Sequence, residues 1–153
     1  MHHQRIEIPI APIPKGRPRI GKGAGGRPVA FTPSRTRAAE ADVLALVSPH
    51  APAEPLLGPI ELDIVFSLPI PRSWPAWRRE AAALGIVYPI GRPDLDNLEK
   101  LLEDALTRAG FWRDDSQIIG VRTRKRYGLR AFSEVWITEL EQPTTAAEWK
   151  ASR

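Results

Sequence analysis

Residues 96–109 carry the feature that most limits what this chain can fold into. Their apolar side chains recur at alternating steps of three and one, which places them in a single stripe along one side of an α-helix. Gly110 then ends the pattern. A helix with one apolar face must bury that face against other elements, so the chain is predicted to build a packed core. The stripe consists of Leu98, Leu101, Leu102, Ala105, Leu106 and Ala109.

Other segments alternate apolar and polar side chains with the two-residue period of a β-strand. The clearest is residues 60–70, where large apolar side chains occupy one face and acidic residues with Ser67 occupy the other. One face is therefore expected to be buried and the other wetter. Pro9 has no amide hydrogen, which places the first strand at a sheet edge. A turn at residues 127–130 joins the last two strands. The predicted strands are residues 5–10, 60–70, 117–126 and 132–140.

Two further segments, near residues 35–47 and 73–85, are predicted to be helices. The resulting order of elements predicts an α+β fold, with a mixed or antiparallel sheet and helices mainly on one face. A chain of 153 residues suits a single domain that spans residues 1–153. Residues 141–153 are predicted to be a tail that is either a frayed helix or disordered.

Composition excludes several classes of protein. No apolar run approaches the roughly 18–20 residues that cross a bilayer, and the N-terminal residues lack the apolar segment of a signal peptide. The chain contains no cysteine, so it holds no disulfide, thiolate nucleophile or thiolate-bound zinc. These features predict a cytoplasmic protein with no membrane partner. The formal net charge of +4 mildly favours a polyanionic partner.

Positive charge is concentrated in residues 12–37, which are rich in proline and glycine and contain no acidic residue. We expect a basic flexible loop or loose hairpin that contacts phosphates. The glycines of residues 21–26 resemble a phosphate-binding loop. However, the flanking residues do not have the strand–loop–helix pattern of such a motif, so no nucleotide cofactor is predicted. The basic residues are Lys15, Arg17, Arg19, Lys22, Arg27, Arg35 and Arg37.

A second basic group lies in the strand predicted at 117–126. Arg122, Arg124 and Arg126 fall on one face by the period of two, with Val121 on the other. A solvated edge strand can carry such charge simply as protection against pairing with another chain. Together with the basic segment, however, the row favours a surface that follows phosphates along a nucleic acid.

Two aspartates lie at the start of the long helix. Asp96, with Glu99 three residues later, has the pattern of a helix cap. A helix needs only one cap, which leaves Asp94 without a capping role. Lys100 lies one turn after Asp96, where the plain interpretation is a surface ion pair of ~0.3–0.5 kcal/mol. In the functional interpretation, the carboxylates bind a hard divalent cation and Lys100 stabilises negative charge on a phosphate.

Two more aspartates, Asp114 and Asp115, follow the helix after a tight reversal. The helix is about 20 Å long at 1.5 Å per residue. A short turn and a strand that runs back along the helix can therefore bring only one end of the returning segment near Asp94. A metal site requires Asp115 to meet Asp94 and Asp96. The spacing of these residues leaves that meeting open.

The stretches PDLDNLEKLLEDAL and AGFWRDDSQI, which contain these acids, strongly resemble the RusA family of Holliday-junction resolvases. PIPKGRPRI, FTPSRTRAAE and SWPAWRREAAALG resemble the phage and prophage branch of that family, so the resemblance covers most of residues 5–140. It implies a RusA-like fold, a homodimer and an endonuclease that depends on Mg²⁺, with Mn²⁺ as a possible substitute.

The resemblance also implies roles for individual residues. Lys100 matches the catalytic lysine of the family, whereas Asp114 matches an acid that is not usually given a metal role. Members often carry a basic residue directly before the first aspartate, but here Pro93 stands there and Arg92 lies one residue earlier. Which arginine guides the scissile phosphate therefore stays open. The expected metal ligands are Asp94, Asp96 and Asp115.

We therefore expect a structure-selective endodeoxyribonuclease that resolves four-way DNA junctions by paired symmetric nicks during recombination and repair. A twofold dimer would present two active sites to such a junction. Two alternatives stay open: a non-catalytic protein that binds branched DNA, and a less selective nuclease that cuts flaps or forks.

Overall fold

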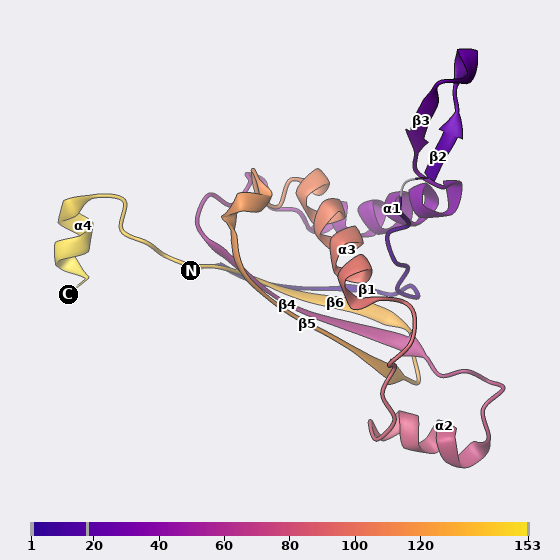
Figure 1. Ribbon diagram of the computed structural model, residues 1–153. Coiled ribbons are helices and arrows are strands. Elements are labelled where there is room, and N and C mark those ends of the chain that lie inside the picture. Colours follow the sequence, from indigo (N-terminus) through magenta and orange to yellow (C-terminus); the bar gives the residue numbers. More distant parts are fainter. Residues whose placement is uncertain (1, 18, 153) are drawn as a thin grey trace.

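The computed structural model describes residues 2–17 and 19–152 (Figure 1). The two terminal residues of the predicted domain, and Pro18 in its basic segment, lie outside the described residues. The elements in chain order are β1 (His2–Ile8), β2 (Arg19–Lys22), η1 (Ala24–Gly26), β3 (Pro28–Phe31), α1 (Ser34–Val47), η2 (Ser48–His50), β4 (Ile60–Pro69), α2 (Ala76–Ala83), α3 (Leu95–Ala109), η3 (Asp115–Gln117), β5 (Ile118–Gly128), β6 (Phe132–Glu139) and α4 (Ala146–Ala151).

The centre of the molecule is a four-stranded mixed sheet with the strand order β1-β6-β4-β5. β6 pairs antiparallel with both β1 and β4, whereas β4 and β5 are parallel. β1 is an edge strand, as Pro9 predicts. Although a short turn joins β5 to β6, these two strands do not pair with each other, because β4 lies between them. Helices α1 and α3 cover one face of the sheet (Figure 1), so the predicted α+β class is confirmed.

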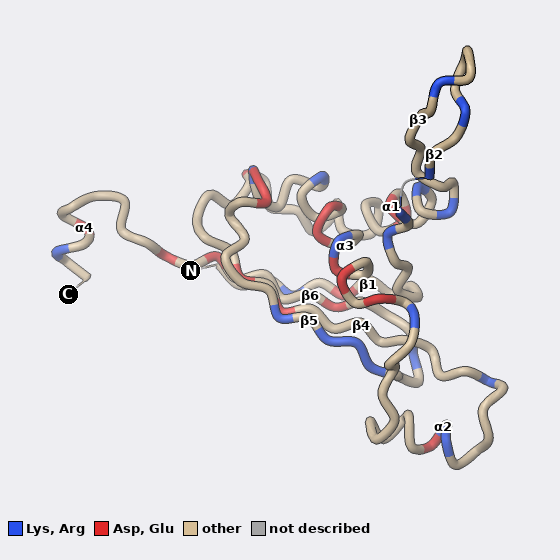
Figure 2. Tube along the Cα trace, viewed as in Figure 1, with Lys and Arg blue, Asp and Glu red and all other residues tan. Residues whose placement is uncertain are grey.

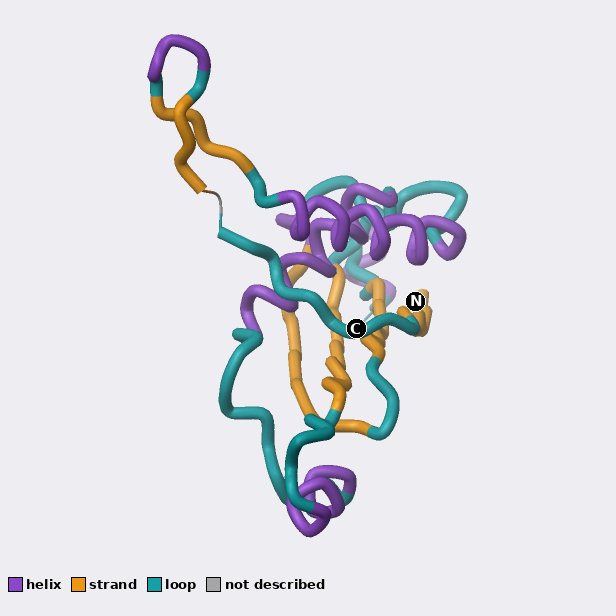
Figure 3. The backbone as a smooth tube through the Cα atoms, turned by 90° about the vertical axis from the view of Figure 1, so that its right-hand side faces the viewer, coloured by secondary structure: helices purple, strands orange, loops and turns teal. Residues whose placement is uncertain are grey.

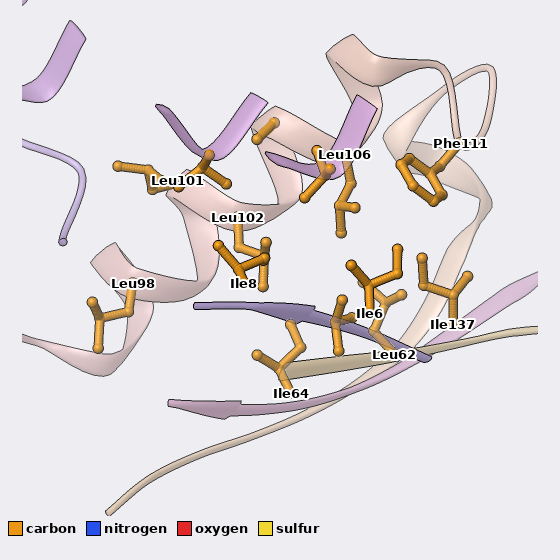
Figure 4. Close-up of a cluster of buried hydrophobic side chains, with 14 of the residues drawn as sticks. Ile6, Ile8, Leu62, Ile64, Leu98, Leu101, Leu102, Leu106, Phe111 and Ile137 are labelled. Atoms are coloured by element: carbon orange, nitrogen blue, oxygen red, sulfur yellow. The ribbon is translucent and has the colours of Figure 1, made fainter. Parts of the chain in front are cut away.

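The core lies between this face of the sheet and α3 (Figure 4). Leu98, Leu102 and Leu106 on α3 are each 2% exposed or less, and they pack against Ile8 and Ile64 from the strands. Each fully buried leucine of this kind contributes about 1.5–3 kcal/mol through the hydrophobic effect. The apolar stripe in the sequence therefore fixes which side of α3 faces the sheet, and the polar side of α3 faces outward.

The second face of the sheet carries mixed charges. Arg124 Nη2 lies 2.7 Å from Asp63 Oδ1 on the neighbouring strand, and Arg5 forms an ion pair with Glu134. This face is less wet than the sequence predicts. Ser67 is buried there. Its hydroxyl donates a hydrogen bond to the carbonyl oxygen of Arg130 in the turn after β5, which satisfies the buried polar group.

Strands β2 and β3 form a separate two-stranded antiparallel hairpin within the predicted basic segment. It projects from the body beside the start of α1, and a second view shows the same projection (Figure 3). The predicted tail contains helix α4, which lies away from the sheet (Figure 1). In the part of the chain that is described, no helix is long and apolar enough to cross a membrane.

Candidate active site

The start of α3 presents two exposed carboxylates. Asp94 occupies the N-cap position, with φ −70° and ψ 139°, but its side chain accepts no capping hydrogen bond. Asp96 lies inside the first turn of the helix, so the expectation that it forms a capping box with Glu99 is wrong. Within the described residues, neither aspartate side chain has a hydrogen bond or an ion pair. Both carboxylates are therefore available to a ligand.

Lys125 on β5 holds the loop that leads into these aspartates. Its ammonium donates to the carbonyl oxygens of Gly91 and Pro93 at 2.7 and 2.8 Å. The sequence does offer a signal for this role. The period of two puts Lys125 on the opposite face from the arginine row, which is the face that α3 covers. Sequence reasoning followed only the arginines and missed this lysine.

Lys100 lies one turn further along the outer side of α3. Its Nζ is 3.0 Å from Asp104 Oδ1 and 3.8 Å from Asp115 Oδ2. The hydrogen bond from Lys100 to Asp104 raises the pKa of Lys100 above its ordinary value, so the side chain is cationic at neutral pH. It forms the ion pair that the plain interpretation predicts, and it also reaches one of the expected metal ligands.

Asp104 ties this lysine to the basic segment. Lys15 also forms an ion pair with Asp104, and its Nζ lies 3.8 Å from Glu40 Oε1. Burial raises the pKa of Asp104, but the hydrogen bonds from the ammonium groups of Lys15 and Lys100 outweigh it and hold the pKa of this carboxyl below its usual range. Lys15 is thus engaged with acids of the domain, unlike the other basic residues of its segment.

Asp115 is fixed at the far end of α3 by a chain of hydrogen bonds. The buried Trp112 donates from Nε1 to Thr107 Oγ1 at 2.8 Å, and the Thr107 hydroxyl lies 2.5 Å from Asp115 Oδ1. Asp114 has a different role, since its carboxylate accepts from Ser116 N and closes a capping box with Gln117. The neighbouring aspartates therefore divide into one that caps a short helix and one that faces Lys100.

Glu103 is half-buried near this end of the site. Burial raises its pKa to about 6, and the negative charges of Glu99 and Asp115 act in the same direction. Glu99 itself accepts a hydrogen bond from Thr123 on β5. Helix α3 is rich in acids, which are Asp96, Glu99, Glu103 and Asp104, and its acidic positions are red in the tube coloured by charge (Figure 2).

The three expected metal ligands do not meet within one chain. Asp94 and Asp96 lie at the start of α3, and Asp115 lies beside Thr107, near its end. Residues 94 and 107 are separated by about 20 Å along a helix that rises 1.5 Å per residue. Among the residues that the structure describes, no three His, Cys, Asp or Glu side chains are grouped so that they could hold a metal.

The predicted DNA-binding residues lie on separate surfaces. Arg122, Arg124 and Arg126 pair in register with Asp63, Val65 and Ser67 of the parallel neighbour β4. Paired residues point to the same side, so the arginine row lies on the face opposite α3. Arg92 is exposed just before the carboxylates. The remaining members are exposed on or beside the β2–β3 hairpin: Arg17, Arg19, Lys22, Arg27, Arg35 and Arg37.

An α+β domain that combines available carboxylates, a cationic lysine and projecting basic side chains has the composition of a protein that acts on nucleic acid phosphates. The comparison with family models gives this class a definite identity. The family model described as "Endodeoxyribonuclease RusA" matches residues 9–138. The chain belongs to this family, and it is a nuclease that hydrolyses DNA.

Individual relatives agree with the family assignment. The chain is 30% identical over 131 residues to "Uncharacterized protein YqaN" of Bacillus subtilis (strain 168), a match that covers 84% of this chain and 91% of that protein. A shorter match, 59% identical over 34 residues, relates it to "Crossover junction endodeoxyribonuclease RusA" of Escherichia coli (strain K12). That match covers 22% of this chain and 28% of the relative, and the RusA protein of Enterobacteria phage 82 matches to the same extent.

Proposed function

We propose that this nuclease is a Mg²⁺-dependent resolvase that acts as a homodimer and places paired symmetric nicks in four-way DNA junctions. The observation that carries this proposal is the pair of exposed, unengaged carboxylates at the start of α3, one turn before the cationic Lys100. The proposal is supported by the family and by the names of the relatives from Escherichia coli and Enterobacteria phage 82, which describe endonucleases of crossover junctions.

The donor chemistry suits the proposed cation. Mg²⁺ prefers oxygen ligands and is commonly bound through one or two carboxylates with water and substrate phosphate completing its shell. Asp94, Asp96 and Asp115 are the residues that would hold it, and Mn²⁺ could take its place. When bound, such an ion makes a water molecule more acidic and stabilises the charge of the phosphate that is being cut.

The side chains of this chain account for the rest of the proposed reaction. Lys100 carries a fixed positive charge beside Asp115, where it can stabilise the negative charge that develops on the scissile phosphate. Trp112 and Thr107 hold Asp115 in one orientation. Lys125 fixes the carbonyl groups of the loop before Asp94, which sets the direction in which that carboxylate points.

We further infer that the proposed metal site is shared between two protomers. One chain supplies Asp94 and Asp96 as a close pair but holds Asp115 at the other end of the helix. A twofold dimer with antiparallel α3 helices would bring Asp115 of one protomer to the aspartate pair of its partner, and the same operation would build the second site. The geometry of one chain supports this arrangement, because Asp115 is held beside Thr107 near the end of α3 and the three acids are not grouped among the described residues.

The test of the proposed function compares three labelled substrates, a four-way junction, a Y-fork and a linear duplex, with Mg²⁺ or with EDTA. We expect symmetric nicks in the junction alone, and only with Mg²⁺. Asp94→Asn and Asp96→Asn should each lower the cutting rate by more than about 100-fold, since even residues that only orient metal ligands commonly contribute 10–100-fold. Both variants should still bind the junction in a gel-shift assay.

Three outcomes would contradict the proposal. Equal cutting of the fork and the junction would indicate a less selective nuclease. Junction binding without cutting of any substrate by the unmodified protein would indicate a DNA-binding protein without nuclease activity. Full activity of both asparagine variants would show that these carboxylates do not hold the catalytic ion.

A further inference from the structure

The β2–β3 hairpin is exposed on both of its faces. All strand residues apart from Gly21 are exposed, and Ile20, Val29 and Phe31 keep 79%, 50% and 49% of their surface accessible. A two-stranded hairpin with nothing packed against it is marginally stable in water. Apolar side chains held out on such a hairpin indicate a surface that is covered when a partner binds.

The charge of the hairpin identifies the class of partner. Residues 8–39 contain no acidic residue. Arg19 and Lys22 lie on β2, and Arg27 lies directly before β3. Basic positions are blue along the hairpin in the tube coloured by charge (Figure 2). Across the described chain, Arg19, Lys22 and Arg27 form no ion pair with an acidic side chain. Cations that have no acid to neutralise them match a polyanion, and double-stranded DNA carries a phosphate charge about every 1.7 Å along its axis.

The base of the hairpin is attached next to the aspartate pair. The backbone N–H of Lys15 donates to the carbonyl oxygen of Asn97 in the first turn of α3 at 2.9 Å. The N–H of Gly16 donates to the hydroxyl of the buried Thr36 on α1 at 3.2 Å. Because of these two bonds, the hairpin leaves the body beside Asp96. DNA held along the hairpin would therefore run past the start of α3.

The hairpin is also thin. Phe31 lies over Gly21, where an added Cβ would come within 2.9 Å of its ring, and Val29 lies over Gly23, where the corresponding distance is 2.5 Å. These glycines let the apolar side chains lie flat across the strands. A two-stranded ribbon, with strands about 4.8 Å apart, fits the major groove, which is about 12 Å wide and 8.5 Å deep.

We propose that the β2–β3 hairpin inserts into the major groove of the duplex arm next to the cleavage site and holds that arm across the start of α3. This inference rests on the proposed function, because it takes branched DNA as the substrate. It assigns the hairpin a groove-binding role in which Phe31 and Val29, which lie on one face of the ribbon, contact base edges. Arg19, Lys22 and Arg27 bind the phosphates on either side.

The absence of cysteine from the chain gives a direct test. Ala24→Cys at the hairpin tip, in an Asp94→Asn background, is labelled with an iron–EDTA reagent and bound to a four-way junction. We expect strand breaks in the arm next to the nick site, on both strands. The matched control is Ala83→Cys, at an exposed position at the end of α2. The same reagent attached there should break the DNA at other positions. The inference would be overturned if the label at the hairpin tip broke DNA only at the junction centre. It would also be overturned if that label produced no strand breaks.

Dimethyl sulfate distinguishes the two grooves, because it methylates guanine N7 in the major groove and adenine N3 in the minor groove. We expect the Asp94→Asn protein to protect guanine N7 in that arm, and protection to disappear when Gly21–Val29 is replaced by a two-residue Asn-Gly turn. Protection of adenine N3 instead would place the hairpin in the minor groove and contradict the proposal. Circular dichroism of the shortened variant checks that the domain is folded.

The phosphate contacts have a separate readout. Lys22→Gln combined with Arg27→Gln should reduce the slope of log K against log salt for junction binding by about 1.8, at about 0.9 per lost phosphate contact. Lys150→Gln on α4 is the control and should leave the slope unchanged. An unchanged slope in the double variant would refute the hairpin contacts. Junction cutting by the unmodified protein, measured in parallel, decides the proposed function independently of these results.

Discussion

At the scale of single residues, Lys125 shows how the loop before a proposed metal ligand can be held by a side chain that has no proposed part in the chemistry. Its two hydrogen bonds end on the carbonyl oxygens of Gly91 and Pro93, immediately before Asp94. A lysine is suited to this task because one ammonium group can donate in three directions. Losing it would leave Asp94 in place but free to point elsewhere.

Lys125→Met is therefore expected to lower the single-turnover rate of junction cutting by about 10–100-fold, the range seen for residues that orient metal ligands. Junction affinity should change little, and Lys125→Arg should recover part of the rate because its guanidinium can also donate to carbonyls. Lys150→Met on the distant helix α4 is the control. A methionine variant that keeps the full rate, or an arginine variant that is no better, would show that Lys125 has no positioning role.

Glu103 should make stability depend on pH. Its pKa is about 6 in the fold and 4.5 in its ordinary state, so the folded protein binds more protons than the unfolded one between these values. Stability then falls as pH rises from 4.5 through 6. In metal-free buffer, Glu103→Gln should raise Tm at pH 7.5 by about 2–4 °C, or about 1 kcal/mol once solvent screening of a half-buried group is allowed for.

The same substitution should have little effect at pH 3.5, where Glu103 is largely protonated in both states. Glu80→Gln on the exposed side of α2 supplies the comparison, and scanning calorimetry at the two pH values gives the result. A gain that is equal at both pH values would mean that ionisation of Glu103 is not its source.

Asp94 stood out in the sequence because a helix needs only one cap and Asp96 was expected to provide it. The structure instead places Asp94 at the N-cap position, without a side-chain capping hydrogen bond, and Asp96 inside the first turn. Thr107 and Trp112 could not be found in this way. Each acts through a contact with a group elsewhere in the fold, and an isolated threonine or tryptophan in a sequence carries no sign of that contact.

At the scale of elements, β5 separates two kinds of basic residue. Lys125 lies on the side that α3 covers, and the arginine row lies on the other. A phosphate role for Arg122 and Arg126 therefore requires DNA on the face opposite the aspartate pair. A linear duplex bound along the hairpin would not reach that face, whereas another arm of a junction could.

We expect Arg122→Gln combined with Arg126→Gln to reduce the salt slope of junction binding by about 1.8, with a smaller effect on linear duplex. Fluorescence anisotropy over a salt series measures both. Equal losses for the two substrates, or no loss for either, would favour the alternative in which the row only protects an exposed edge strand. Arg124 is left in place because it is paired with Asp63.

The elements themselves were largely predictable, because their apolar periods differ clearly. The 3.6-residue stripe of α3 and the two-residue alternation of β4 match the observed helix and strand to within a residue or two. The pairing of strands was less predictable. The short turn before β6 suggests a hairpin with β5, but the helical connection through α3 brings β5 beside β4 as a parallel neighbour, and β6 takes the other side of β4.

At the scale of the whole molecule, the proposal that two protomers share each metal site predicts an unusual result for mixed dimers. Asp94→Asn and Asp115→Asn should each be inactive alone. When the two variants are unfolded together and refolded, the mixed dimer has one site with both changes and one site with neither. We expect the mixture to regain single-strand nicking, up to about a quarter of the unmodified activity if protomers pair at random.

The control mixture combines Asp94→Asn with Asp96→Asn, which lie in the same half of the proposed site. Both sites of that mixed dimer carry one change, so no activity should return. A junction assay that resolves single from paired nicks measures the outcome. If the first mixture stays as inactive as its components, all three aspartates must act within one chain, and the shared site is wrong.

The position of β6 between β1 and β4 also has a consequence for synthesis. The interior of the sheet is completed by its last strand, since residues 2–8 pair with residues 133–139 and with no strand made earlier. A nascent chain that has not yet released Phe132–Glu139 from the ribosome leaves both β1 and one edge of β4 without a partner. Such long-range pairing slows folding. The complete sheet, and with it the full core beneath α3, can therefore form only after nearly the whole chain has been made.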